Sequence, residues 1–143
     1  MQTVVHVTHE AIQKIGGIGA VLQGLLTSST YLKAVPRNIL VGPFWPGDET
    51  GDRRLGPNAE VLYSSMDSLS RSPLASKFRE IEQEYDVGIV YGRRKFLDKE
   101  TGVISVPEIL LIDVSRFEPS KIGVFKFELW EKFGIDSSRY ENI

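Results

Sequence analysis

Short runs of β-branched and apolar residues predict the strands of an α/β protein. Such runs occupy residues 3–8 (TVVHVT), 38–43 (NILVGP), 59–63 (AEVLY), 87–92 (VGIVYG) and 109–114 (ILLIDV). The last run is the most apolar of the chain, and only a polar segment separates it from the run before it. We therefore expect the last two strands to pair with each other.

Apolar residues at intervals of three and four predict three amphipathic helices, near residues 18–32, 73–85 and 120–133. Gly134 is expected to close the last helix. The inner side of that helix is predicted to consist of Ile122, Phe125, Leu129, Trp130 and Phe133. Alternation of strands and helices predicts an α/β fold, a three-layer Rossmann-like sandwich with a mostly parallel sheet and a central first strand.

Composition narrows the classes of function. The length of 143 residues fits one domain, and 17 basic against 19 acidic residues leave a net charge of −2, which disfavours nucleic-acid binding. The absence of cysteine excludes disulfides, thiolate nucleophiles and cysteine-ligated metals. No apolar run approaches the roughly 18 residues that cross a bilayer, and the N-terminus lacks a signal-peptide pattern. No membrane association and a cytoplasmic location are expected.

The two histidines and a cluster of basic residues do not by themselves indicate a binding site. His6 and His9 are three residues apart at an extended strand, so they point to opposite faces and no metal site is expected. Arg93, Arg94 and Lys95 follow a strand and could meet an anionic donor or an acidic partner. A solvated strand end is the favoured interpretation of this cluster.

A glycine-rich segment at residues 14–19 (KIGGIG) joins the first strand to the first helix. Glycines let the backbone approach an anion, a helix start presents free N–H groups, and Lys14 adds a positive charge. Taken alone, a tight strand-to-helix turn is favoured over a phosphate site. The motif G-x-G-x-x-G is broken by Leu22, and a Walker A loop would place the lysine after the glycines. NAD and ATP sites are therefore set aside.

The surrounding residues resemble a known family. The segment 9–18 (HEAIQKIGGI), directly after a first strand, looks like the N-terminal signature of glycogen and starch synthases, in which K-x-G-G opens the first helix. Glu10 stands four residues before Lys14, as in the animal and fungal type. Residues 38–44 (NILVGPF) and the strand at 109–114 with its following helix are similar to later segments of that type. The resemblance runs over nearly all 143 residues.

The resemblance implies a GT-B glycosyltransferase, built from two Rossmann-like domains with a sugar nucleotide in the cleft between them. Residues 1–143 would form a single, truncated N-terminal domain without the second, nucleotide-binding domain. Lys14 and the backbone of Gly16 and Gly17 would face the phosphates of a UDP-glucose or ADP-glucose donor, and Glu10 would line the same cleft. Neither a metal nor another cofactor is implied.

The expected function is the N-terminal portion of a glycogen-synthase-like enzyme that transfers glucose from the donor to an α-1,4-glucan acceptor. The isolated chain is expected to be inactive, because the family's other diphosphate contacts belong to the second domain. The alternative is a noncatalytic domain of the same fold that binds sugar nucleotide, glucan or another subunit. Three helices are too few to cover both faces of the sheet, which predicts a homo-oligomer, most simply a twofold dimer.

Overall fold

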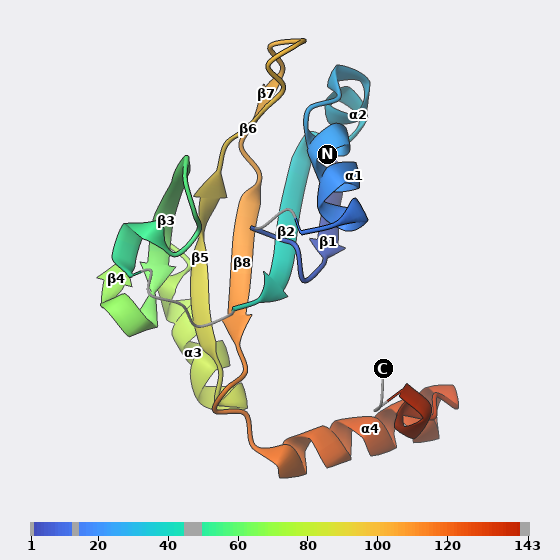
Figure 1. The fold of residues 1–143 in the computed structure, drawn as a ribbon. Helices are drawn as coiled ribbons and strands as arrows, with labels where there is room; N and C mark the ends of the chain where they lie inside the picture. The colour runs from blue at the N-terminus through green and yellow to red at the C-terminus, as the bar shows by residue number, and fades with distance from the viewer. Residues whose placement is uncertain (1, 13–14, 45–49, 141–143) are drawn as a thin grey trace.

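The computed structural model describes residues 2–12, 15–44 and 50–140, which form a mixed α/β structure (Figure 1). The strands are β1 (Thr3–Val7), β2 (Arg37–Pro43), β3 (Ala59–Ser64), β4 (Leu69–Ser70), β5 (Gly88–Arg94), β6 (Phe96–Leu97), β7 (Ile104–Ser105) and β8 (Glu108–Asp113). The α-helices are α1 (Gly17–Leu26), α2 (Ser29–Ala34), α3 (Ala75–Tyr85) and α4 (Pro119–Phe133). Short 3-10 turns are η1 (Gly51–Arg53), η2 (Ser65–Asp67) and η3 (Ser137–Tyr140).

The main sheet has the strand order β1-β2-β8-β5-β3-β4. Strands β1, β2 and β8 are parallel, whereas β8–β5, β5–β3 and β3–β4 are antiparallel pairs. The prediction of a mostly parallel sheet with a central first strand is therefore wrong, since β1 lies at an edge and antiparallel pairs are in the majority over the described ranges. The predicted pairing of the strands now seen as β5 and β8 is confirmed.

The connection between β5 and β8 explains why this half of the sheet is antiparallel. Parallel neighbours need a crossover, usually a helix, whereas a direct return makes the next strand antiparallel. Residues 95–107 contain no helix, and their two arms pair as the β6–β7 hairpin. The chain therefore comes straight back beside β5.

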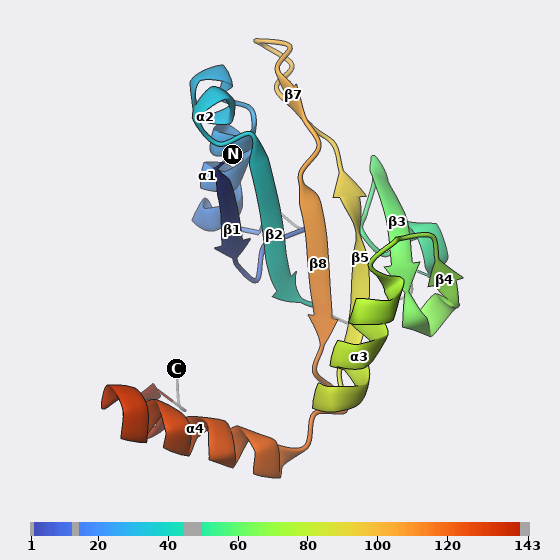
Figure 2. The ribbon, with the colours of Figure 1, turned by 180° about the vertical axis from the view of Figure 1, so that it is seen from behind.

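Helices cover the two faces of the sheet unequally. Figures 1 and 2 show α1 and α2 over β1 and β2 on one face and α3 over β5 and β3 on the other. Side chains alternate between the faces along each strand. On β5, Val90 joins the core under α1, while Ile89 and Tyr91 join the core under α3.

The predicted helix near residues 18–32 is two helices. Thr27 follows α1 and donates its hydroxyl to the Gln23 carbonyl, at 2.6 Å. Ser28 then caps α2, accepting the Tyr31 N–H at 3.3 Å. Hydroxyl side chains bind nearby backbone groups and favour helix ends over helix interiors. The run of such residues at 27–30 therefore separates the two helices.

Helix α4 forms at the predicted position and ends at Gly134, whose φ of 66° is the left-handed conformation typical of a helix C-terminus. Its predicted inner side is wrong. The helix leaves the end of β8 and extends away from the sheet in both views, and none of its residues is buried. Phe125, Trp130 and Phe133 are 59%, 60% and 70% exposed. Among the described helices, none is both long and apolar enough to cross a membrane.

Candidate functional site

The loop between β1 and α1 begins at the carboxyl end of β1, in the parallel half of the sheet. The Thr8 N–H donates to the Val41 carbonyl at 2.8 Å, so the loop starts in contact with β2. Gly42 makes this approach possible. A Cβ at Gly42 would lie 2.4 Å from the Thr8 carbonyl oxygen and 3.0 Å from the Ala11 Cβ. Strand β2 therefore needs glycine where the loop crosses it.

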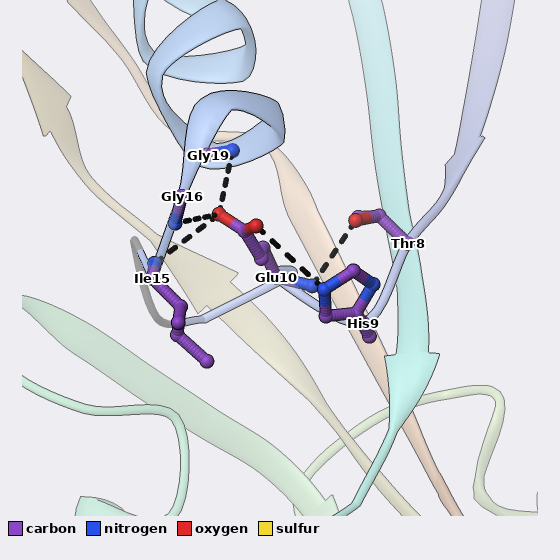
Figure 3. A network of polar contacts seen from close by, with 6 residues as sticks. All are labelled: Thr8, His9, Glu10, Ile15, Gly16 and Gly19. Atoms are coloured by element: carbon purple, nitrogen blue, oxygen red, sulfur yellow. Dashed lines mark hydrogen bonds and ion pairs between the residues drawn. The ribbon is translucent and has the colours of Figure 1, made fainter.

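The carboxylate of Glu10 organises this loop (Figure 3). Glu10 is 6% exposed, and its Oε2 accepts the backbone N–H groups of Ile15, Gly16 and Gly19 at 3.2, 3.0 and 2.7 Å. Gly16 is the N-cap of α1 and has no side chain to accept these donors. A buried carboxylate from six residues earlier in the chain thus occupies the position where a capping residue or a bound anion would lie.

Hydrogen bonding fixes the charge of Glu10. The backbone N–H of Gly16, with those of Gly19 and Ile15, holds the pKa of Glu10 below its usual value, because these donors stabilise the carboxylate. Burial acts in the opposite direction and is the weaker influence overall. The contribution of Glu10 to stability is therefore present above its ordinary pKa of 4.5 and is lost as the pH falls through the lowered value.

Of the residues predicted to form the site, Glu10, Gly16 and Gly17 are brought together at the start of α1. Lys14 lies outside the described residues. The Gly16 N–H already has Glu10 as its acceptor, and a Cβ at Gly16 would lie 3.3 Å from Glu10 Oε1. Gly17, the first residue of α1, differs, because among the described residues no other part of the chain lies within 4 Å of a Cβ placed there.

Arg94 joins the site, whereas the interpretation favoured by the sequence for its cluster is a solvated strand end. Only Arg93 and Lys95 are exposed as the solvated-end interpretation expects. The Arg94 guanidinium donates to the Ile12 carbonyl and lies 5.4 Å from the centroid of the Phe96 ring. Burial lowers the pKa of Arg94, although a guanidinium remains charged at neutral pH.

The signal that would have found Arg94 is the alternation along β5. Val90, Gly92 and Arg94 are two residues apart and share the face of the sheet that α1 covers. Arg94 and Glu10 consequently line the same depression beside α1. The other residues lining this depression are Ala11, Ile12, Gly19, Leu22, Gln23, Leu40 and Phe96.

The histidines belong to separate surroundings. His6 Nε2 lies 3.0 Å from Asn38 Oδ1 and 3.2 Å from the Tyr31 hydroxyl, between β1 and α2. His9 lies beside the loop carboxylate, with its Nε2 3.6 Å from Glu10 Oε1. Within residues 2–12, 15–44 and 50–140, no three histidine, aspartate or glutamate side chains group in a way that could hold a metal ion.

The Glu10 carboxylate occupies the start of α1, so the N–H groups of Gly16 and Gly19 already have an acceptor. No described side chain lies over Gly17, and the partly buried Arg94 guanidinium lies in the depression that Glu10 also lines. Comparison with family models, with curated proteins and with solved structures finds no match to this chain.

Proposed function

We propose that this chain is the N-terminal, acceptor-side portion of a glycogen-synthase-like enzyme that transfers glucose from UDP-glucose or ADP-glucose to an α-1,4-glucan. One observation carries the proposal: the Glu10 carboxylate binds three N–H groups between Ile15 and Gly19. Glu10 and Gly16 are among the residues on which the resemblance to glycogen synthases rests, together with Lys14 and Gly17. In the structure, the single carboxylate of Glu10 bridges the backbone from Ile15 to Gly19, so Glu10 and the start of α1 form one structural unit.

In this proposal, Glu10 is a positioning residue and the donor diphosphate approaches at Gly17. The loop follows the carboxyl end of β1, and ligands of open α/β sheets bind outside such strand ends. No described atom beyond its chain neighbours and its own helix would contact a Cβ at Gly17, so a phosphate oxygen can come close to the backbone there in this proposal. Lys14 is proposed to add its charge from the same loop. Gly16 shapes the loop, since its N–H is already bonded to Glu10.

The proposal places activity in a larger catalytic unit in the cytoplasm. Glucosyl transfer requires stabilisation of the leaving diphosphate, and removing one such electrostatic contact typically costs about 100- to 1000-fold in rate. A second domain of a GT-B fold would supply the remaining contacts. The 143-residue chain alone is expected to transfer no measurable labelled glucose to glycogen.

Isothermal titration with UDP-glucose and ADP-glucose tests the site. The chain is expected to bind one of these donors weakly, and Lys14→Ala is expected to reduce that affinity by at least about tenfold, since it removes a charge that contacts phosphate. Lys33→Ala serves as a control because Lys33 is exposed on α2. Equal heats in the parent chain and Lys14→Ala would remove Lys14 from the site.

A second matched pair of variants tests Gly17. Gly17→Ala adds a methyl group where the diphosphate is proposed to approach, and it is expected to weaken donor binding without lowering the unfolding midpoint. Gly24→Ala is the control, because Gly24 lies in the same helix and also has no atom within 4 Å of its added Cβ. Undiminished donor affinity in Gly17→Ala would contradict the assigned approach.

The noncatalytic alternative is supported by a different observation, the exposed apolar residues of α4. An assembly domain of the same fold would use that surface and would not need the β1–α1 loop to bind donor. Absence of heat with either sugar nucleotide, together with self-association of the chain, would favour this second function.

A further inference from the structure

On the side of the sheet covered by α3, none of the described helices lies over β1 and β2 (Figure 2). The register places Val5 beside Ile39, and Val7 beside Val41, which in turn lies beside Leu110. Val5 and Val7 are 53% and 81% exposed. Helix α3 covers the β5–β3 part of this side, and Leu110 of β8 packs against the cluster beneath it (Figure 2). We call the exposed Val5 and Val7 with the half-buried Ile39 and Val41 the bare sheet face.

Helix α4 presents an apolar stripe that no described element covers. Positions three and four apart share one side of a helix. By this spacing the stripe consists of Ile122, Phe125, Leu129, Trp130 and Phe133. The polar side of the helix contains Lys121, Glu128 and Lys132, and Lys132 Nζ lies 3.7 Å from Glu128 Oε2.

The start of α4 is held against the end of α3 by its polar side. Lys121 Nζ donates to Asp86 Oδ2 at 2.6 Å and to the Glu84 carbonyl at 3.1 Å. These contacts turn the polar side toward the chain's own body. At 100° per residue, Ile122, Leu129 and Phe133 lie roughly 80–120° around the helix from Lys121, whereas Phe125 lies about 40° from it. No residue of α4 is buried on its own chain. The chain's own bare sheet face is therefore left without α4, although the two surfaces are chemically alike.

We propose that a second copy of this chain covers both surfaces. The α4 stripe of each copy packs on the bare sheet face of the other, in a reciprocal twofold exchange that satisfies both apolar surfaces at once. This inference is independent of the proposed function.

The available area fits such a dimer. Phe125, Trp130 and Phe133 are 59–70% exposed. Since an aromatic side chain can bury about 150–250 Å², the stripe offers on the order of 400 Å² per copy. Two helices docked on two sheet faces would bury on the order of 1,500 Å² in all, within the roughly 1,200–2,000 Å² of specific interfaces. The exchange therefore accounts for a stable dimer without any further partner.

Sedimentation equilibrium of the 143-residue chain at several concentrations tests the dimer. The mass is expected to rise from 16.0 kDa toward twice that value. Phe125→Glu with Phe133→Glu, and separately Val5→Lys with Val7→Lys, should each give a monomer, because each double variant charges one side of both interfaces. Val124→Glu on another side of α4 and Ile104→Glu on β7 are controls at exposed apolar positions, and they should leave the dimer intact.

Mixing the two double variants identifies the surfaces that meet. In the mixed dimer, one interface is that of the parent chain and the other pairs the new glutamates with the new lysines, so association should return. A parent chain that is monomeric at every concentration would overturn the proposal. So would a Val5→Lys, Val7→Lys variant that dimerises like the parent chain, because α4 would then pair with some other surface.

Hydrogen exchange of the unmodified chain decides the matter if either double variant fails to fold, as judged by circular dichroism. Protection of residues 3–7 and 119–133 should increase together as the concentration rises. Protection that rises in only one of the two segments, or in neither, would overturn the exchange.

Discussion

Helices α3 and α4 have similar sequence patterns and opposite surroundings. On α3, Ala75 and Phe78 are 6% and 8% exposed, and the Phe78 ring lies between those of Tyr63 and Tyr91, at 5.1 and 5.0 Å. On α4, no residue is buried, although this helix is longer and richer in aromatic residues. The same periodicity therefore produces a packed helix in one place and an uncovered one in another.

The difference comes from how each helix is attached. Helix α3 stands between β4 and β5, so both of its ends lead into strands of the same sheet. Helix α4 follows β8 and is attached to the sheet at its start alone within the described residues. Periodicity predicts that a helix has an apolar side, whereas the strands before and after it determine what that side meets.

The largest expected effect is the loss of stability when the α3 core is truncated. Phe78→Ala should lower the free energy of unfolding by about 3–5 kcal/mol, because it leaves a cavity between two aromatic rings. Phe125→Ala on α4 should lower it by less than about 0.5 kcal/mol, since exposed side chains contribute little. Urea unfolding at a concentration where the chain is monomeric measures both.

Losses of similar size in these two variants would contradict the comparison. That result would mean that α4 packs on its own chain in solution. Circular dichroism before unfolding checks that Phe78→Ala still folds, and Phe78→Leu provides a milder substitution at the same position, with an expected intermediate loss.

Much of the secondary structure follows from local pattern, because burial on a sheet or against a sheet imposes periods of two and of 3.6 residues. The order of the strands in the sheet does not follow from local pattern. The edge position of β1 depends on where β8 inserts, and β8 pairs with β2 after more than sixty intervening residues. The hairpin arms at 96–97 and 104–105 are too short to leave a periodic signal.

In the candidate site, too, the sequence predicts the local turn but not the contacts between segments far apart in the chain. The glycines at 16 and 17 predict where the loop and the start of α1 lie, because paired glycines are typical of a strand-to-helix turn. The sequence does not show that the Glu10 carboxylate folds back on the N–H of Gly19, since that contact depends on how the loop crosses β2 at Gly42. Arg94 is brought in by β5, far away along the chain.

A smaller loss of stability than that of Phe78→Ala is expected when the polar side of α3 is changed at Glu82. Glu82 accepts the Tyr63 hydroxyl at 2.7 Å, the Ser65 hydroxyl at 2.6 Å and the Ile89 N–H at 2.8 Å. Glu82→Gln should lower the free energy of unfolding by about 1–3 kcal/mol, because an amide cannot accept all three donors and one is left unsatisfied. Thermal or urea unfolding measures the change.

Glu128→Gln on α4 is the matched control for Glu82→Gln. Glu128 pairs with Lys132 within the same exposed helix, so its substitution should change the free energy of unfolding by less than about 0.5 kcal/mol. An effect of Glu82→Gln as small as that of Glu128→Gln would show that the polar side of α3 contributes no more to stability than that of α4.

The smallest effect concerns the direction of α4. Asp86 raises the pKa of Lys121 by hydrogen bonding to its ammonium group, so the pair holds below the ordinary pKa of 10.5 and is lost as the pH rises through the raised value. Both side chains are partly exposed, at 39% and 49%, and ion pairs that water reaches contribute little, so Lys121→Ala should leave the unfolding midpoint nearly unchanged. It should instead broaden the distance distribution between spin labels on cysteines introduced at Gln83 and Glu131, measured in the monomeric Phe125→Glu, Phe133→Glu background. The chain has no cysteine of its own, so both labels are unique.

Raising the pH above 10.5 should broaden the distance distribution between the two labels when Lys121 is present, and it should change nothing in Lys121→Ala. A distribution that Lys121→Ala does not broaden at neutral pH would show that α4 holds its direction without this ion pair.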